Sequence, residues 1–315
     1  MRSILIHPII LAGVLSLAPA PAFAATVTVD CSGGTPGAFT TITAALAALD
    51  QQGPHTINVT GTCTESVSVF RRERLTIQAS PAGATIEWSA TTQPALGITG
   101  SNNIVVRGLT VRGSTVWIDT SAVVIDQVTV EHSGTQGVMV VGGSTVRMTS
   151  SVIEDSTNEG LWLEPGASAQ LGDVTVRRNT TGIVTRGATL DVTGALTVEG
   201  NPWAGLSVRA GFVRLSTNRG DNIIRTNGVG LDIDGTTVVF NGRNVVQANN
   251  GFGIQVGLGG SARFNAVTSS GVTQGALGLH ECEDHCYDYG TWIFSFVCTE
   301  DYDCSVSCEC FHDIE

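Results

Sequence analysis

Glycine residues recur through the second half of this chain at a nearly constant spacing, and the spacing restricts the folds that the chain can adopt. Between residues 123 and 279 the interval is roughly 22 to 25 residues. Each interval contains three short runs in which apolar and polar residues alternate, and each run ends at a turn rich in Gly, Asn or Ser. This period of two predicts three β-strands per interval, and no interval has a helical period. The recurring glycines are Gly137, Gly160, Gly182, Gly205, Gly230 and Gly253.

Other repeat architectures do not fit this unit. A leucine-rich repeat needs its own Leu and Asn spacing together with a helical segment, and a propeller blade needs about 40 residues. The remaining solution is an all-β parallel β-helix, in which equivalent strands of successive coils pair ~4.8 Å apart. We expect roughly eight to ten coils, in which every second side chain of a strand points into a stacked interior.

With this pattern, residues 29–279 resemble the right-handed parallel β-helix, or pectate-lyase-like, superfamily of exported bacterial proteins. The resemblance implies the fold and not one activity, because the architecture carries lyases, hydrolases, epimerases, adhesins and inert stalks. The run Val116-Trp117-Ile118-Asp119 is similar to a tetrapeptide of pectate lyases in which His follows the Asp, but Thr120 follows here. The second lyase signature and the polygalacturonase signatures are absent from the sequence.

The chain divides into four predicted segments. Residues 1–24 have the charged start, apolar core and small-residue end of a signal peptide, with cleavage near Ala24. Residues 25–66 are expected to form an N-terminal cap, residues 67–279 the β-helix, and residues 280–315 a disulfide-rich acidic C-terminal cap. The sequence therefore predicts a secreted or periplasmic protein that does not span a membrane.

Cysteine positions fit export. Cys31 and Cys63 both lie in the N-terminal cap, where a short helix should present Ile42 and Leu46 to the first coil. In an oxidising compartment we expect these two thiols to form a disulfide. Six further cysteines in the C-terminal segment predict three disulfides of undetermined connectivity, with zinc binding as the alternative. They are Cys282, Cys286, Cys298, Cys304, Cys308 and Cys310.

Charge excludes several functions. The net charge is -12, and all 16 basic residues are Arg, because the sequence contains no Lys. Lysine Schiff-base chemistry is therefore excluded, and an acidic chain without basic clusters is a poor nucleic-acid binder. The one dense basic run, at residues 71–74, is interpreted as a solvated turn, with contact to an anionic glycan as the alternative. We expect a monomer.

Alignment of the coils places charged residues in columns on the outer surface. One column follows the Val-x-Val strand and contains Arg112, Glu131, Glu154, Arg177, Glu199, Arg225 and Gln247. Neighbours in such a column lie close enough to form ion pairs, so a solvated ladder is the first interpretation. The alternative is an acid/base cluster of Glu131, Glu154, Asp155 and Arg177, for which the resemblance to carbohydrate lyases of this fold implies calcium as a possible cofactor.

A second column lies after the strand that each recurring glycine begins, and it contains Glu164, Arg186, Arg209 and Asp234. Trp162 stands beside it and either shields the strands as part of an outward stack or offers a flat face on which a sugar ring can stack. Trp162, Glu164, Arg186 and Arg209 are therefore the ligand-binding candidates. The asparagines of the turns are predicted to form a structural ladder instead. They are Asn158, Asn179, Asn201, Asn227 and Asn249.

Two functions follow from these features. The first is a non-catalytic scaffold that binds glycans or cell-surface partners along a polar face. The second is a polysaccharide lyase or epimerase that acts on an acidic glycan. A deep groove with convergent charged groups and shifted pKa values would favour the enzyme.

Overall fold

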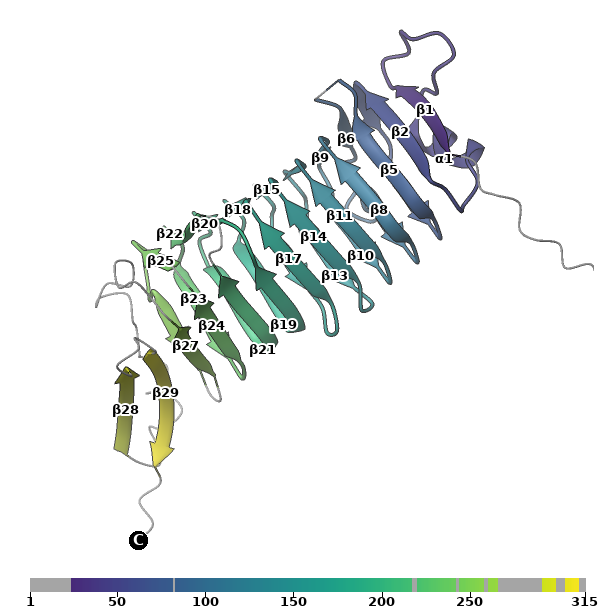
Figure 1. Ribbon diagram of the computed structural model, residues 1–315. Helices are drawn as coiled ribbons and strands as arrows, with labels where there is room; N and C mark the ends of the chain where they lie inside the picture. The colour runs from purple at the N-terminus through teal and green to yellow at the C-terminus, as the bar shows by residue number, and fades with distance from the viewer. Residues whose placement is uncertain are drawn as a thin grey trace, which may run out of the picture.

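The protein is a parallel β-solenoid whose strands stack along one long axis (Figure 1). The computed structural model describes residues 24–81, 83–216, 220–241, 244–257, 260–265, 291–298 and 304–311. The signal-peptide prediction and Cys282 and Cys286 of the predicted tail disulfides lie outside the described residues. Within them, no helix has the length and apolar character needed to cross a bilayer.

Each coil contributes strands to three parallel sheets, which we number 1 to 3. Sheet 1 comprises β4 (Val67–Phe70), β7 (Leu96–Thr99), β10 (Val116–Asp119), β13 (Val138–Val141), β16 (Glu159–Leu163), the first parts of β19 (Thr181–Val192) and β21 (Ala204–Ser216), β23 (Val229–Asp234) and β26 (Ile254–Val256).

Sheet 2 comprises β1 (Ala25–Asp30), β2 (His55–Thr60), β5 (Glu73–Ala79), β8 (Asn102–Arg107), β11 (Ala122–Asp126), β14 (Thr145–Thr149), β17 (Ser168–Gly172), the second parts of β19 and β21, β24 (Thr237–Asn241) and β27 (Ser261–Asn265). The two long strands β19 and β21 pass from sheet 1 to sheet 2 without a break in strand structure.

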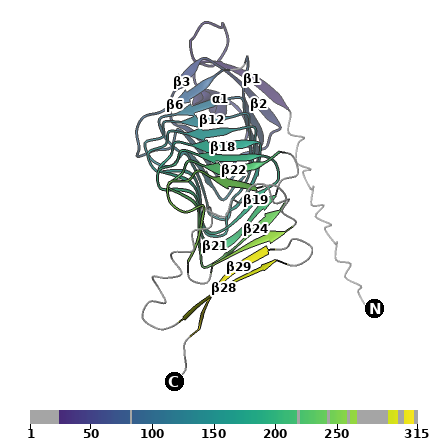
Figure 2. The same ribbon diagram turned by 90° about the vertical axis from the view of Figure 1, so that its left-hand side faces the viewer.

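Sheet 3 comprises β3 (Thr62–Thr64), β6 (Thr85–Glu87), β9 (Thr110–Arg112), β12 (Thr129–Glu131), β15 (Val152–Glu154), β18 (Val174–Arg177), β20 (Leu196–Glu199), β22 (Asn222–Arg225) and β25 (Asn244–Gln247). Figure 2 shows β3, β6, β12, β18 and β22 stacked above one another. Because each coil supplies one strand to this 9-stranded sheet, the described residues form nine coils, as the sequence predicted.

The interior is a set of aliphatic columns. In sheet 1, Leu96, Val116, Val138, Leu161 and Ile183 face inward in register, and all are buried. Burial of this kind contributes about 25 cal/mol per Å² of apolar surface, so the stacked columns supply the main stabilisation of the fold.

The recurring glycines are required by close contact between coils. A Cβ atom built at Gly182 would lie 2.5 Å from the backbone oxygen of Gly205, and one at Gly160 would lie 2.7 Å from the oxygen of Gly182. No side chain can occupy that space. Each recurring glycine therefore marks the point in the sequence at which a coil enters sheet 1.

Ladders of buried polar side chains satisfy the backbone at the turns. The amide Oδ1 of Asn201 accepts from the backbone N–H of Asn179, and the same contact joins Asn227 to Asn201 and Asn249 to Asn227. The sequence-based prediction was wrong for Asn158: the next ladder position belongs to Ser156, whose N–H donates to Asn179 Oδ1. Ser156 directly follows a left-handed residue, as each ladder asparagine does, whereas Asn158 does not.

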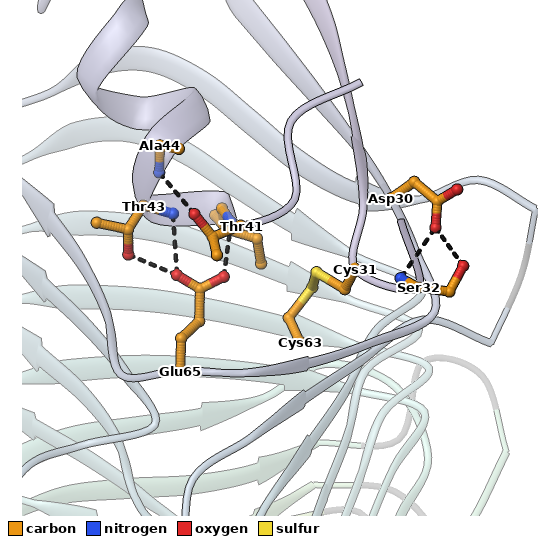
Figure 3. The surroundings of a disulfide bond; sticks show 9 residues. Asp30, Cys31, Ser32, Thr41, Thr43, Ala44, Cys63 and Glu65 are labelled. Atoms are coloured by element: carbon orange, nitrogen blue, oxygen red, sulfur yellow. Dashed lines mark hydrogen bonds between the residues drawn. A yellow bond between two sulfur atoms is a disulfide. The ribbon is translucent and has the colours of Figure 1, made fainter. Parts of the chain in front are cut away.

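The N-terminal end is closed by α1 (Ile42–Ala48), which buries Ile42, Ala45 and Leu46 against the first coil. Thr41 caps the helix through its side chain, and Glu65 accepts hydrogen bonds from the backbone of Ile42 and Thr43 (Figure 3). The predicted disulfide between Cys31 and Cys63 is present beside this cap (Figure 3).

At the other end, the backbone of β29 (Cys304–Phe311) pairs antiparallel with β27, and β28 (Thr291–Cys298) pairs antiparallel with β29. This hairpin extends sheet 2 beyond the last parallel strand. The prediction that residues 280–315 form a disulfide-bonded cap, or bind zinc, stays a prediction.

Candidate functional site

The outer face of sheet 1 carries a central column of side chains that runs across five coils. Ser68 pairs in register with Gly97, Gly97 with Trp117, Trp117 with Met139, and Met139 with Trp162. The column therefore has a gap at Gly97, followed by three large side chains with apolar surfaces.

A groove of about 600 Å³ lies over the first four positions of this column. One wall is the loop before β7, in which Pro94 approaches Gly97 so closely that a Cβ atom there would lie 3.1 Å from Pro94 Cγ. A second loop, before β13, contributes Thr135 and Gln136. The volume is within the range of small-molecule sites, about 300–1,000 Å³.

The lining of the groove contains hydroxyl, amide and apolar groups and no titratable side chain. Its residues are Ser66, Val67, Ser68, Thr91, Thr92, Gln93, Pro94, Gly97, Thr99, Ser114, Thr115, Trp117, Thr135, Gln136 and Met139. Hydroxyl and amide groups can bond to a polyol, and an indole face can pack on the apolar face of a sugar ring. The groove offers no acid, base or nucleophile of the usual kinds.

Several of the hydroxyls hold the walls in place. Ser66 Oγ donates to the carbonyl oxygen of Pro94 at 2.7 Å, and Ser114 Oγ donates to that of Gln93 at 2.9 Å. Thr115 and Thr135 share a hydrogen bond of 2.7 Å between their hydroxyls. These contacts join neighbouring coils, so the groove is formed before any ligand arrives.

Three of the four predicted ligand-binding residues lie together where the groove ends. The indole N–H of Trp162 donates to Glu164 Oε1 at 2.8 Å, and the guanidinium carbon of Arg186 lies 4.4 Å from the Trp162 ring centroid. Glu164 thus fixes one edge of the indole, and Arg186 covers one face through a cation–π contact. Trp162 is next to Met139 in register, so this cluster continues the floor of the groove.

The fourth candidate, Arg209, is held elsewhere. It aligns with Arg186 in the next coil, but its guanidinium donates to Asp234 at 3.1 Å and to Asp232 at 3.2 Å. A ligand that used Arg209 would have to displace these carboxylates.

The four residues proposed as an acid/base cluster are also brought together, on the outer face of sheet 3. Glu131 is next to Glu154 in register, and Glu154 is next to Arg177. Arg177 Nε donates to Glu154 at 2.7 Å, and Arg178 bonds both Glu154 and Asp155. Glu131 is paired with Arg112 of the preceding coil.

These ion pairs shift the pKa values of Asp155 and Arg178 in the directions opposite to those that an acid and a base would need. Hydrogen bonds from Arg178 hold the pKa of Asp155 below its usual value, and the nearby positive charge of Arg177 acts in the same direction. Hydrogen bonds to Asp155 and Glu154 raise the pKa of Arg178. Arg177, the proposed base, donates to the Glu154 carboxylate as a member of an ion-pair ladder does, so the arrangement favours the ladder interpretation.

Two residues of the basic run support the cap. Arg72 donates to the carbonyl oxygens of Leu46, Leu49 and Asp50 at 2.6–2.7 Å, and Arg74 donates to those of Gln52 and Gly53. The interpretation of residues 71–74 as a solvated turn was wrong for Arg72, which is half-buried; Arg74 also bonds to the backbone of the cap but is exposed.

A metal site is not evident among the described residues. There, one group of three His, Cys, Asp or Glu side chains is close enough for an ion, and it consists of Cys31, Cys63 and Glu65. Both sulfur atoms are in the disulfide, and Glu65 bonds to α1. Calcium binding stays a prediction.

The model of the family described as "right handed beta helix region" matches residues 55–195 and 107–275. The chain belongs to this right-handed β-helix family. No curated protein sequence gives a significant match to it.

Among solved structures, this β-helix is similar to pectate lyase Pel9A at 12% identity, over 82% of this chain and 80% of that chain, with a TM-score of 0.47. It is similar to the A-module of mannuronan C-5 epimerase AlgE6 from Azotobacter vinelandii at 12% identity, over 68% and 66%, with a TM-score of 0.38. A tailspike protein 2 domain of Bacteriophage CBA120 is 13% identical, over 66% of this chain and 34% of that chain, with a TM-score of 0.35. These similarities concern the fold alone.

Sequence reasoning missed most of the groove of this β-helix. The signal was partly visible, because Trp117 belongs to the tetrapeptide that resembles the lyase motif, and its place in a strand puts it on the outer face. The loop that contains Thr91 and Pro94 gave no signal of its own. Its position over Gly97 depends on contacts between neighbouring coils, made by residues 28 and 21 positions apart in the sequence.

Proposed function

We propose that this protein is an exported, non-catalytic β-helix that binds a glycan chain in the groove on sheet 1. The observation that carries the proposal is the composition of the groove lining, which combines hydroxyls, amides and Trp117 with no titratable side chain. Such a surface can bond to hydroxyl groups and stack on a sugar ring, but it has no group that can transfer a proton. The predicted signal peptide and the Cys31–Cys63 disulfide fit an exported protein.

The groove and the Trp162–Glu164–Arg186 cluster lie along one line of sheet 1. A polymer can therefore occupy the groove and extend over Met139 to Trp162, where Arg186 offers a positive charge. Arg186 can pair with an acidic group of a glycan there, beside the carboxylate of Glu164. Trp162, Glu164, Arg186 and Arg209 stay the candidate contact residues at that end.

The test is binding and turnover measured with the same samples. Purified mature protein is applied to a panel of acidic and neutral polysaccharides, and retention is measured together with new reducing ends and unsaturated ends. We expect retention without turnover, weakened about tenfold by Trp117→Ala, which corresponds to ~1.4 kcal/mol. The matched control is Phe212→Ala, because Phe212 is an exposed aromatic residue on another sheet.

Lyase or epimerase activity is the second candidate, and the convergence of Glu131, Glu154, Asp155 and Arg177 on sheet 3 is the observation that favours it. Product formation that is lost on Arg177→Ala or Glu154→Ala, with folding intact, would replace the binding proposal. Absence of both retention and turnover on every glycan would leave a structural role.

A further inference from the structure

Most described arginines have a partner: Arg71 and Arg186 contact aromatic rings, and Arg72 and Arg74 bond to the backbone of the cap. Within the described residues, seven others form ion pairs: Arg107, Arg112, Arg177, Arg178, Arg209, Arg214 and Arg225. Arg147, at the centre of β14, has no ion pair or hydrogen bond from its side chain to any other described residue.

The register explains why Arg147 is unpaired. Its neighbours on sheet 2 are Val124 in the preceding coil and Gln170 in the following coil, and neither carries a charge. The next residue in this column is Asp191, which accepts two hydrogen bonds, of 2.8 and 2.6 Å, from Arg214 on its other side. The positive charge of Arg147 is thus left uncompensated in its column.

Arg147 lines a depression of about 270 Å³ on sheet 2. Four other polar side chains line it, and none of them makes a side-chain hydrogen bond to another described residue: Asn103, Thr145, Ser168 and Gln170. The remaining lining residues are Ala or Val, and no carboxylate is present. In a chain with a net charge of -12, four uncommitted polar side chains thus surround one unpaired guanidinium.

We propose that this depression, the Arg147 site, binds a small oxyanion in the form of a carboxylate or sulfate group. A guanidinium presents its N–H groups in a planar fork that matches two oxygens of such a group. The hydroxyls of Thr145 and Ser168 and the amides of Asn103 and Gln170 can donate to the remaining oxygens. The depression is smaller than the usual range for whole ligands, so it accepts one group and not a polymer.

The site is separate from the groove on sheet 1. The two lining sets have no residue in common, and they lie on different sheets. Anion binding at Arg147 can therefore succeed or fail whatever the groove binds.

The experiment titrates the mature protein with sodium sulfate and, separately, with sodium glucuronate, at constant ionic strength set with sodium chloride. Binding is followed by calorimetry and by the NMR signal of the arginine side-chain N–H groups. We expect saturable binding of at least one anion, weakened at least tenfold by Arg147→Gln. The Arg147→Lys variant keeps the charge but lacks the planar fork of N–H groups. Its affinity for the anion should therefore lie between those of the wild type and Arg147→Gln. The tighter of the two anions identifies the group that the site prefers.

Arg214→Gln is the matched control, because it removes the same charge from the same column of the same sheet at a residue already paired with Asp191. It should leave the affinity within twofold of the wild type. An equal loss in Arg147→Gln and Arg214→Gln would show a general effect of net charge and would overturn the site. So would the absence of saturable binding of both anions by the wild-type protein.

Discussion

Glu65 and Arg72 bind opposite ends of the same helix. The carboxylate of Glu65 accepts from the N–H groups of Ile42 and Thr43, at 2.6 and 3.0 Å, where α1 begins. The guanidinium of Arg72 donates to Leu46, Leu49 and Asp50 where α1 ends. A negative charge at the N-terminus and a positive charge at the C-terminus both complement the helix dipole. Two residues of the first coil thus fix the cap that closes the solenoid.

Loss of either residue should loosen the cap. We expect Glu65→Ala or Arg72→Met to lower the stability of α1 by about 1–2 kcal/mol, the usual cost of a lost cap. Hydrogen exchange of the amides of Leu46 and Leu49 measures this directly. Arg71→Met is the control, because Arg71 contacts the Phe70 ring and makes no bond to α1. Unchanged exchange in both cap variants would show that burial of Ile42 and Leu46 alone holds the helix.

The recurring glycines should tolerate no side chain. In Gly182→Ala, the new methyl group would lie 2.5 Å from the Gly205 oxygen, so two coils would have to separate. We expect a loss of about 2–4 kcal/mol in the free energy of unfolding. Gly172→Ala is the control, because the nearest atom to its Cβ is 3.8 Å away. Urea unfolding of both variants tests the contrast, and equal stabilities would refute the steric explanation.

The fold was accessible from the sequence because its causes are local and repeated. Alternation of apolar residues set the strand faces, and it placed Glu131, Glu154 and Arg177 in one column that the structure confirms. Asn158 was misassigned because composition marks a turn but not the position within it. The residue after the left-handed backbone position enters the ladder, and backbone conformation at Asp155 decides that this residue is Ser156.

The groove was less accessible because it depends on contacts between coils. Gly97 gives no repeat signal, and its role appears only when Pro94 is seen above it. Stacking of Arg186 on Trp162 likewise joins residues one coil apart. Alignment of the coils within the sequence placed these two residues at neighbouring positions, but only the side-chain conformations show that they are in contact.

Thr185 is a polar residue in an aliphatic column. It faces inward between Leu163 and Val208, it is fully buried, and its hydroxyl has no hydrogen-bond partner. Thr185→Val removes this unpaired group at almost constant volume, so we expect stability to rise by about 1–2 kcal/mol. Thr189→Val lies on the outer face of the same strand and should change stability by less than ~0.5 kcal/mol. Thermal unfolding compares the two variants, and a destabilised Thr185→Val would contradict the assignment.

Asp155 should make stability depend on pH. Its pKa is lowered in the folded protein by hydrogen bonds from Arg178, so its contribution is present at neutral pH, above the pKa of an unfolded Asp, about 3.9. The contribution is lost as the pH falls through the lowered folded value, because protonation then breaks the pair in the folded state. Asp155→Asn should therefore be less stable than the wild type at pH 7, by up to ~1 kcal/mol. The difference should shrink as the pH approaches the folded pKa, and also at high salt.

Urea unfolding at pH 7 and at progressively lower pH measures this difference. Asp173→Asn is the control, because Asp173 has the same left-handed backbone conformation as Asp155 but forms no ion pair within the described residues; its only described side-chain bond is to the backbone of Ala195. A constant difference between Asp155→Asn and the wild type at every pH would contradict the titration of Asp155. The loss of stability would then come from altered packing around Arg178. In that case the ion-pair ladder on sheet 3 would stabilise the solenoid through its packing geometry and not through its charges.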